Sequence, residues 1–292
     1  MMTPQAFARL VRLPAALTAP GDALAGAAAT GWPIGPRTLF LPLSSTLIYW
    51  AGMALNDYAD RELDAVERPE RPIPAGDVTP GEALAVAILL TGAGVGVAAL
   101  AGGRRALAVA VPLAASVWAY DLVFKPTALG PVAMATTRLL DVLLGAGAGA
   151  RRNALPTALT VFTHTLGTTT LSRDEVHGSA SGRVGTLALI GTVCATVAAA
   201  AGTSRRSANG WLPRVGGAAL ALVYLQSVAP AQVVARRTRA AADVRRAVGA
   251  SVIGTIGLQA ALIARSGSLA TALAVAALLP LGRRLSRRVS AT

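Results

Sequence analysis

The sequence predicts an all-α integral membrane protein, because it is too apolar and too poor in charge for a soluble domain. Its 292 residues are 53% hydrophobic and only 14% charged, and the mean hydropathy is +0.55. These values lie outside the range of ordinary soluble domains. A membrane span needs about 20 predominantly apolar residues, so the chain can hold roughly nine or ten spans and little else. We therefore treat residues 1–292 as a single transmembrane domain.

Apolar runs bounded by proline, glycine or arginine locate the expected spans. Because open strands leave backbone polar groups unsatisfied in lipid, each run is expected to form a helix. The runs lie near residues 13–31, 38–57, 82–101, 105–123, 128–149, 154–172, 184–202, 211–234, 246–264 and 268–282. The last run is short and can lie in the interface instead, so the bundle contains nine or ten transmembrane helices.

The basic residues predict the orientation of the chain. A formal net charge of +13 would suggest nucleic acid in a soluble protein, but in a membrane protein it is better explained by topology. With ten spans, most basic residues lie on the side that holds both termini, the 58–80 loop and the 173–183 loop. The positive-inside rule places that side in the cytoplasm. We expect a multi-pass protein of a bacterial plasma membrane, with membrane lipids and no nucleic acid as partners.

Small residues recur within the expected spans. Two glycine-rich runs, at 92–96 and 145–149, would let neighbouring helices approach closely. A coding bias toward alanine and glycine explains either run equally well. The one cysteine, Cys194, lies in an apolar run and is expected to be a small buried hydrophobic residue.

A segment after the second expected span reverses the charge of the chain. Residues 57–82 hold more than half of its 14 acidic residues, although the protein as a whole carries +13. At about 100° per residue, Asp57, Asp60 and Asp64 share one narrow face of a helix that leaves the membrane. Asn56 lies one step aside. Three crowded carboxylates repel one another, so they either take up protons or hold a cation.

The composition of this cluster indicates which cation it would hold. Its ligands are all oxygen atoms, with no histidine or cysteine nearby, which favours a hard ion such as Mg²⁺. Because Mg²⁺ commonly shares its coordination shell with substrate phosphates, the metal would link the protein to a diphosphate. The alternative is a solvated helix end whose acids serve topology and solubility.

The next segment, residues 67–76, contains three prolines that predict a stiff, extended loop. It places Arg68 and Arg71 near the carboxylates. Guanidinium groups bind phosphate oxygens bidentately, so these two arginines could complete a diphosphate site. Ordinary interfacial arginines are the alternative interpretation.

These residues resemble the first motif of the UbiA family of intramembrane prenyltransferases, N-D-x-x-D-x-x-x-D, followed by an arginine–proline loop. All named positions of the motif are present, as Asn56, Asp57, Asp60 and Asp64. The spans are compatible with the family over nearly the whole chain, and the EboC-like branch is the most similar. The resemblance implies a helical bundle around a central cavity, in which Mg²⁺ and the first motif hold a prenyl diphosphate.

Two further segments resemble the family more weakly. One is Arg12-Leu13-Pro14, which precedes the first span. The other is the cytoplasmic end of the fourth span, with Tyr120, Asp121 and Lys125. Tyr120 could face a carbocation through its ring, and Lys125 could bind the diphosphate or extend to lipid headgroups. The implied reaction is Mg²⁺-dependent transfer of a prenyl group to an aromatic or lipophilic acceptor, a small molecule or a lipid, with release of diphosphate.

The second aspartate-rich motif of the family is incomplete here. Its place after the sixth span is taken by the segment LSRDEVHG at residues 171–178, which has no second acid four residues from Asp174 or Glu175. Asp174 or Glu175 could still hold a second Mg²⁺. Arg173 and Glu175 are expected to contact the substrate. The missing acid pair leaves the acceptor chemistry open.

Two other functions fit the same residues. A terpene cyclase on the same scaffold would use the same donor site, and a membrane transporter or lipid-binding protein could use the acids for a coupling ion. The acids lie at a helix end beside arginines rather than at the midplane, which favours the transferase. Within the spans, Arg138 and Asp141 are expected to neutralise each other, and His164 to be a polar cap inside the bundle.

Overall fold

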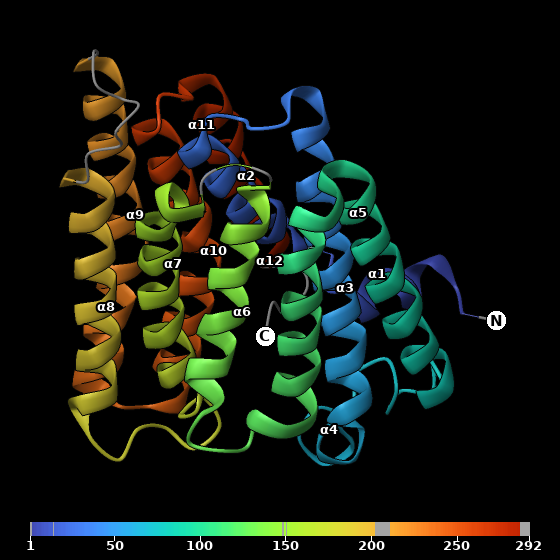
Figure 1. Ribbon diagram of the computed structural model, residues 1–292. Helices are drawn as coiled ribbons and strands as arrows, with labels where there is room; N and C mark the ends of the chain where they lie inside the picture. The colour runs from blue at the N-terminus through green and yellow to red at the C-terminus, as the bar shows by residue number, and fades with distance from the viewer. Residues whose placement is uncertain (1, 14, 148, 150, 202–210, 287–292) are drawn as a thin grey trace.

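The computed structural model describes residues 2–13, 15–147, 149, 151–201 and 211–286. In these ranges every regular element is helical, and the long helices stand side by side as a bundle (Figure 1). In the described part of the chain, five helical segments are long and apolar enough to cross a membrane: Gly35–Ala59, Pro80–Phe124, Gly182–Ala201, Trp211–Thr238 and Ala241–Arg265. The predicted all-α membrane bundle is confirmed.

Helices occur at each of the predicted spans. In chain order they are α2 (Ala19–Thr30), α3 (Phe40–Ala59), α5 (Pro80–Ala119), α6 (Gly130–Gly145), α7 (Arg151–Ser172), α8 (Gly182–Ala201), α9 (Trp211–Thr238), α10 (Ala241–Arg265), α11 (Leu269–Ala276) and α12 (Leu278–Ser286). Shorter elements complete the chain: α1 (Pro4–Leu10), η1 (Ala15–Thr18), η2 (Gly35–Leu39), α4 (Arg61–Glu67) and η3 (Tyr120–Phe124). α5 covers the two predicted spans at 82–101 and 105–123. They meet at Gly103, where the backbone leaves helical geometry with φ 58° and ψ −145°.

The first and last predicted spans are shorter than expected. α2 has 12 residues, or about 18 Å of helix, whereas the hydrocarbon core is about 30 Å thick. Pro20 lies in its first turn, where the missing N–H and the ring prevent a preceding helix from continuing. The last run is divided into α11 and α12 around Ala277. None of these three helices is long enough to cross a bilayer by itself.

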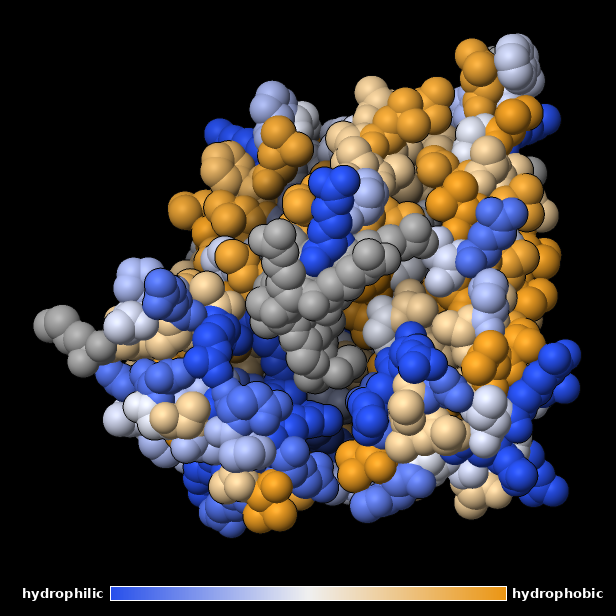
Figure 2. All heavy atoms as spheres, turned by 180° about the vertical axis from the view of Figure 1, so that it is seen from behind, coloured by the Kyte–Doolittle hydropathy of each residue, from blue (hydrophilic) through white to orange (hydrophobic). Residues whose placement is uncertain are grey.

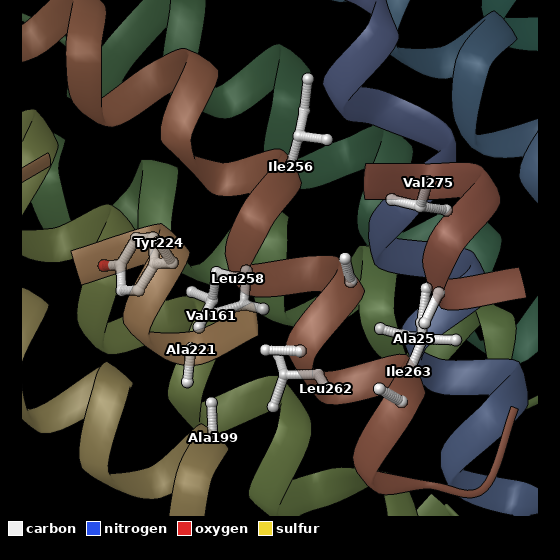
Figure 3. Close-up of a cluster of buried hydrophobic side chains, with 14 of the residues drawn as sticks. Ala25, Val161, Ala199, Ala221, Tyr224, Ile256, Leu258, Leu262, Ile263 and Val275 are labelled. Atoms are coloured by element: carbon white, nitrogen blue, oxygen red, sulfur yellow. The ribbon is translucent and has the colours of Figure 1, made fainter. Parts of the chain in front are cut away.

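α10 is the central helix of the bundle. In its most apolar window 83% of the residues are buried, compared with 22% for Pro80–Phe124. Figure 3 shows Leu258 and Leu262 of α10 among Val161 of α7 and Tyr224 of α9. A helix that is apolar on all sides is expected to be surrounded by others, and α10 has this character.

The outer helices expose apolar side chains to the surroundings. Leu89 and Leu100 of α5 and Leu187 and Ile190 of α8 are examples. Figure 2 shows apolar residues over the upper part of one face and a hydrophilic rim at its lower edge, the end at which α4 lies in Figure 1. Cys194 is exposed on α8, so the expectation that it is buried is wrong; α8 is an outer helix, and an apolar run does not distinguish lipid contact from burial.

Candidate functional site

The acidic segment lies where α3 gives way to α4. The junction residue is Asp60, with φ −86° and ψ 0°. The expected single helix is therefore wrong, since Asp57 belongs to α3 and Asp64 to α4. Two backbone hydrogen bonds nevertheless span the junction: Asp60 donates to the carbonyl of Asn56 at 2.9 Å, and Asp64 donates to that of Asp60 at 2.8 Å. The three acids therefore stay at the same end of the bundle.

Two arginines meet at Asp57. Arg12 Nη2 donates to Asn56 Oδ1 at 2.8 Å and to Asp57 Oδ1 at 2.9 Å. Arg71 Nη1 donates to Asp57 Oδ1 at 2.7 Å and lies 3.7 Å from Asp64 Oδ2. Asp57 is only 2% exposed, so these charge-assisted bonds are formed away from bulk water, where they are strong.

The loop that supplies Arg71 is folded rather than extended. Arg71 donates its N–H to the carbonyl of Arg68 at 3.0 Å, and Ala75 donates to that of Arg71 at 2.9 Å. The fixed φ of proline suits turns as well as extended chain, which is why the expectation from the three prolines was wrong. The turns separate the roles of the two arginines, because Arg71 is buried against Asp57 while Arg68 lines a cavity.

Lys125 and Asp121 join the same end of the bundle from η3 and the residue after it. Lys125 Nζ forms an ion pair with Asp60 Oδ2. Asn56 Nδ2 donates to Asp121 Oδ1 at 3.0 Å, and Asp121 is 8% exposed. Lys125 therefore lies at the site rather than extended toward lipid headgroups.

The oxygen atoms left over in this cluster suit a metal ion. Asp57 Oδ2 and Asp64 Oδ2 are buried and have no hydrogen-bond partner. Across the described ranges, no three acidic, histidine or cysteine side chains come close enough to hold one ion together. Such a cage is not required for Mg²⁺, which is commonly bound by one or two carboxylates while water and substrate phosphates complete its shell. The residues present therefore fit Mg²⁺.

Burial dominates the electrostatics of the cluster. It raises the pKa of Asp64 above its usual value, which Arg71 opposes and Asp60 reinforces. It also lowers the pKa of Arg71, and the positive charge of Arg12 adds to this effect. Both shifts arise because a buried charge loses the solvation that water provides. A cation bound at Asp64 would favour the ionised carboxylate and reverse the first shift.

A cavity of about 380 Å³ opens beside the cluster. Its walls come from α3, α5, η3, α6, α7 and α10. Polar residues line one end, namely Arg12, Asn56, Arg68, Asp121, Lys125 and Glu175. Farther from the helix ends the wall combines apolar and polar side chains. The apolar ones are Ile48, Met53, Val117, Met134, Val248 and Val252, and the polar ones include Tyr49, Thr137, Arg138, His164 and Thr255. Tyr120 also lines the cavity, and its contact with a substrate stays a prediction.

Two residues of the polar end, Arg12 and Asp121, were not predicted as site residues. Both lie in segments that resemble the family only weakly, and neither position alone distinguishes a site residue from an interfacial charge. Their shared contact with Asn56 identifies them. Because Arg12 precedes α2 and Asp121 follows α5, this contact depends on how the helices assemble.

The segment after α7 brings one acid to the cavity. Glu175 lines it and is 6% exposed, and its Oε1 is buried without a hydrogen-bond partner. Burial raises the pKa of Glu175, and Arg68 opposes this. Among the described residues that line the cavity, Asp174 and Arg173 are absent; Arg173 is exposed and donates to the carbonyl of Thr127 at 2.5 Å. The turn after α7 directs Glu175 inward in place of Asp174.

His164 connects three helices deep in the bundle. Tyr224 Oη lies 2.7 Å from His164 Nδ1, and Nε2 lies 2.9 Å from the Thr255 hydroxyl and 3.2 Å from the Ser251 carbonyl. A carbonyl can only accept, so we assign the proton to Nε2 and let Nδ1 accept from Tyr224. Both nitrogens are then occupied, which suits the expected polar cap and not a base.

Arg138 does not pair with Asp141 as expected. Its Nε lies 2.8 Å from Asp22 Oδ2 of α2, while Asp141 Oδ2 accepts a hydrogen bond from the Ser45 hydroxyl at 2.8 Å. The prediction considered a single helix and could not include α2, whose close crossing with α6 brings a third charged residue to this position.

The sequence matches the family model of UbiA prenyltransferases over residues 15–250. The chain belongs to the UbiA prenyltransferase family. The matched region extends from η1 into α10 and therefore includes the acidic junction, the cavity and Glu175.

Relatives of this UbiA-family chain include proteins named digeranylgeranylglyceryl phosphate synthase. The one from Methanospirillum hungatei JF-1 is 42% identical over 79 residues, which is 27% of this chain and 28% of the relative. The one from Methanoculleus marisnigri is 32% identical over 194 residues, which is 65% of this chain and 69% of the relative. The first of these alignments thus covers under a third of the relative. The EboC-like branch stays a prediction.

Two solved structures share the UbiA fold with this chain. A structure concerned with digeranylgeranylglyceryl phosphate synthase in membranes has a TM-score of 0.65 and 17% identity, and the match covers 90% of this chain and 98% of that one. The apo structure of a UbiA homologue from Aeropyrum pernix K1 has a TM-score of 0.66 and 17% identity, covering 85% and 96%. At this identity the similarity concerns the fold alone.

Proposed function

We propose that this protein transfers a prenyl group from a prenyl diphosphate to a lipophilic acceptor inside the membrane and releases diphosphate. The observation that carries the proposal is one cavity that has a cation-rich polar end and, beside it, a stretch of apolar wall from Met53, Val117, Met134, Val248 and Val252. Such a cavity suits a ligand with an anionic head and an isoprenoid tail. Membership of the UbiA family supports this reaction over ion transport.

The polar end would bind and activate the diphosphate. Arg68, Lys125 and Arg12 present N–H groups that can bind its oxygens through charge-assisted hydrogen bonds. As the allylic C–O bond breaks, negative charge grows on the leaving oxygen, and donors already in place stabilise it. Mg²⁺ held by Asp57 and Asp64 would supply further positive charge for the departing diphosphate. Arg71 keeps these two carboxylates together.

The rest of the cavity would control what the prenyl carbon meets. Apolar side chains such as Met53 and Val117 exclude water, so the acceptor rather than water reacts with the carbon. The ring of Tyr120 lines the same space and can stabilise developing positive charge. A bond forms between the acceptor and the prenyl carbon, the C–O bond to diphosphate breaks, and the acceptor gives up one proton. Glu175, in preference to Asp174, is the acid we propose for a second Mg²⁺.

The relatives support a lipid acceptor. Their name, digeranylgeranylglyceryl phosphate synthase, describes a product with two prenyl chains on a glycerol phosphate. We therefore favour an acceptor of that class, a prenylated glycerol phosphate, over an aromatic one. The basic residues at the α4 end support an active site that faces the cytoplasm.

Turnover is the direct test of this function. Purified protein in lipid nanodiscs is incubated with a prenylated glycerol phosphate and with labelled prenyl diphosphates. The prenyl chains have roughly 10, 15 and 20 carbons, which spans the size of common ligand tails. We expect a new prenylated product and diphosphate with Mg²⁺, and neither with chelator. A hydrocarbon product would indicate cyclisation instead, and metal-dependent binding without products would argue for a non-enzymatic function.

Lys125 is expected to act mainly in donor binding. Lys125→Met removes one charge-assisted contact, so we expect the KM for prenyl diphosphate to rise about tenfold. Lys125→Arg keeps the charge beside Asp60 and should retain most of the affinity. Steady-state kinetics at saturating acceptor measures both. An unchanged donor KM in Lys125→Met would show that this lysine serves only the ion pair with Asp60.

A further inference from the structure

A fourth cation, Arg138, lines the cavity at a distance from Arg12, Arg68 and Lys125. Arg138 lies eight residues after the start of α6 at Gly130, which corresponds to about 12 Å along the helix axis. It lines the same cavity as Lys125, and its side chain is 15% exposed. An ionised group at such a depth is costly in a membrane protein and commonly marks a functional site.

The guanidinium of Arg138 is held by Asp22, which does not line the cavity and is itself bound by Gln259. Its Nε faces Asp22 Oδ2 at 2.8 Å, and Asp22 is completely buried. Gln259 Nε2 donates to Asp22 Oδ1 and to the carbonyl of Thr18, each at 2.7 Å. No hydrogen bond joins the Nη atoms of Arg138 to another described residue. The ion pair with Asp22 thus holds the Nε side of the guanidinium, and its terminal N–H groups stay available for a ligand.

The described residues that line the inner end of the cavity include no acid that would compete for those N–H groups. Among the described residues that line the cavity, the acidic ones are Asp121 and Glu175, and both lie at the polar end. The neighbours at the inner end carry neutral polar groups, such as Tyr49, Thr137 and Thr255. His164 is engaged with Tyr224 and the α10 backbone. An oxyanion at this end would therefore find one oriented cation and several hydroxyl groups.

We propose that Arg138 is the oxyanion-binding residue of a second subsite, which takes the phosphate or carboxylate of the acceptor. The proposal rests on the proposed prenyl transfer, because it assigns the inner end to the acceptor and the outer end to the donor. Bidentate binding by a guanidinium fixes the orientation as well as the position of an oxyanion. Arg138 would thereby position the acceptor with its nucleophile toward the prenyl carbon.

Binding of simple amphiphiles tests this subsite without any need for turnover. The probes are 1-oleoylglycerol 3-phosphate, oleate and the neutral 1-oleoylglycerol, measured with protein in nanodiscs without Mg²⁺ and without prenyl diphosphate. We expect the wild type to bind at least one anionic probe about ten- to a hundredfold more tightly than the neutral one. The stronger of the two anions identifies the head group.

Three variants show which end of the cavity produces the preference for anionic over neutral probes. Arg138→Gln combined with Asp22→Asn removes both charges together, so no buried charge is left uncompensated, and it should abolish the preference. Arg265→Gln removes another buried arginine that does not line the cavity and should retain it. Lys125→Met alters the outer end, where the diphosphate is proposed to bind, and shows whether the anionic probes bind there instead.

Two results would overturn the subsite. A wild type that binds the three probes equally has no oxyanion site. A preference that survives in the Arg138→Gln/Asp22→Asn variant but disappears in Lys125→Met places the anion at the outer end and makes Arg138 a structural ion pair. Because no prenyl diphosphate is present, neither result depends on whether the protein catalyses prenyl transfer.

Discussion

Replacing Asp57 with asparagine is expected to reduce prenyl transfer by about a hundredfold or more while the protein stays folded. Asp57 is the point where Arg12 and Arg71 meet, and its Oδ2 has no partner. Asparagine keeps the shape and an oxygen for the two arginines. It removes the negative charge that would bind Mg²⁺, so donor activation should fail. Turnover at saturating Mg²⁺ and prenyl diphosphate, together with thermal unfolding, measures the two effects separately.

The matched control is Asp243→Asn. Asp243 lies in the first turn of α10 and pairs with the exposed Arg246 at 2.7 Å, outside the cavity. An exposed pair of this kind contributes little to stability, so activity and unfolding should both stay near those of the wild type. Wild-type turnover in a folded Asp57→Asn protein would show that the first acidic motif does not activate the donor.

The sequence was sufficient for the bundle and for the position of the acidic cluster at one end of it. Apolar runs located the helices because lipid leaves few alternatives to helical backbone, and the spacing of Asn56, Asp57, Asp60 and Asp64 was specific enough to indicate one cluster. Lys125 lies at this end and pairs with Asp60, while its binding of diphosphate stays a prediction. These predictions depend on local patterns, namely run length, charge and motif spacing, which a single segment already contains.

Features that depend on contacts between helices could not be predicted in this way. The pairing of Arg138 with Asp22 needs the crossing of α2 and α6, so a pattern within α6 alone pointed to Asp141 instead. The choice of Glu175 over Asp174 depends on the direction of the turn after α7. The break at Asp60 was missed because a helical projection assumes continuous helix, whereas the chain changes from α3 to α4 there.

The crossing of α2 and α6 is expected to be highly sensitive to added volume. A Cβ on Gly145 would overlap the carbonyl group and Cα of Ala23, and a Cβ on Gly26 would overlap the carbonyl oxygen of Val142. Backbone cannot yield as a flexible side chain can, so Gly145→Ala should lower the free energy of unfolding by about 1–3 kcal/mol. The overlap is relieved only if α2 and α6 separate. Since α2 carries Asp22, separation would also release Arg138.

Gly92→Ala is the matched control, because it lies in the other glycine-rich run and an added Cβ there meets nothing within 4 Å. Its effect on the free energy of unfolding should stay within about 1 kcal/mol, since only helix propensity changes. Thermal unfolding of both variants in one detergent compares them directly. A large loss for Gly145→Ala alone means that packing explains the 145–149 run. Equal, small effects would favour a coding bias for both runs and would require α2 and α6 to be farther apart than they are here.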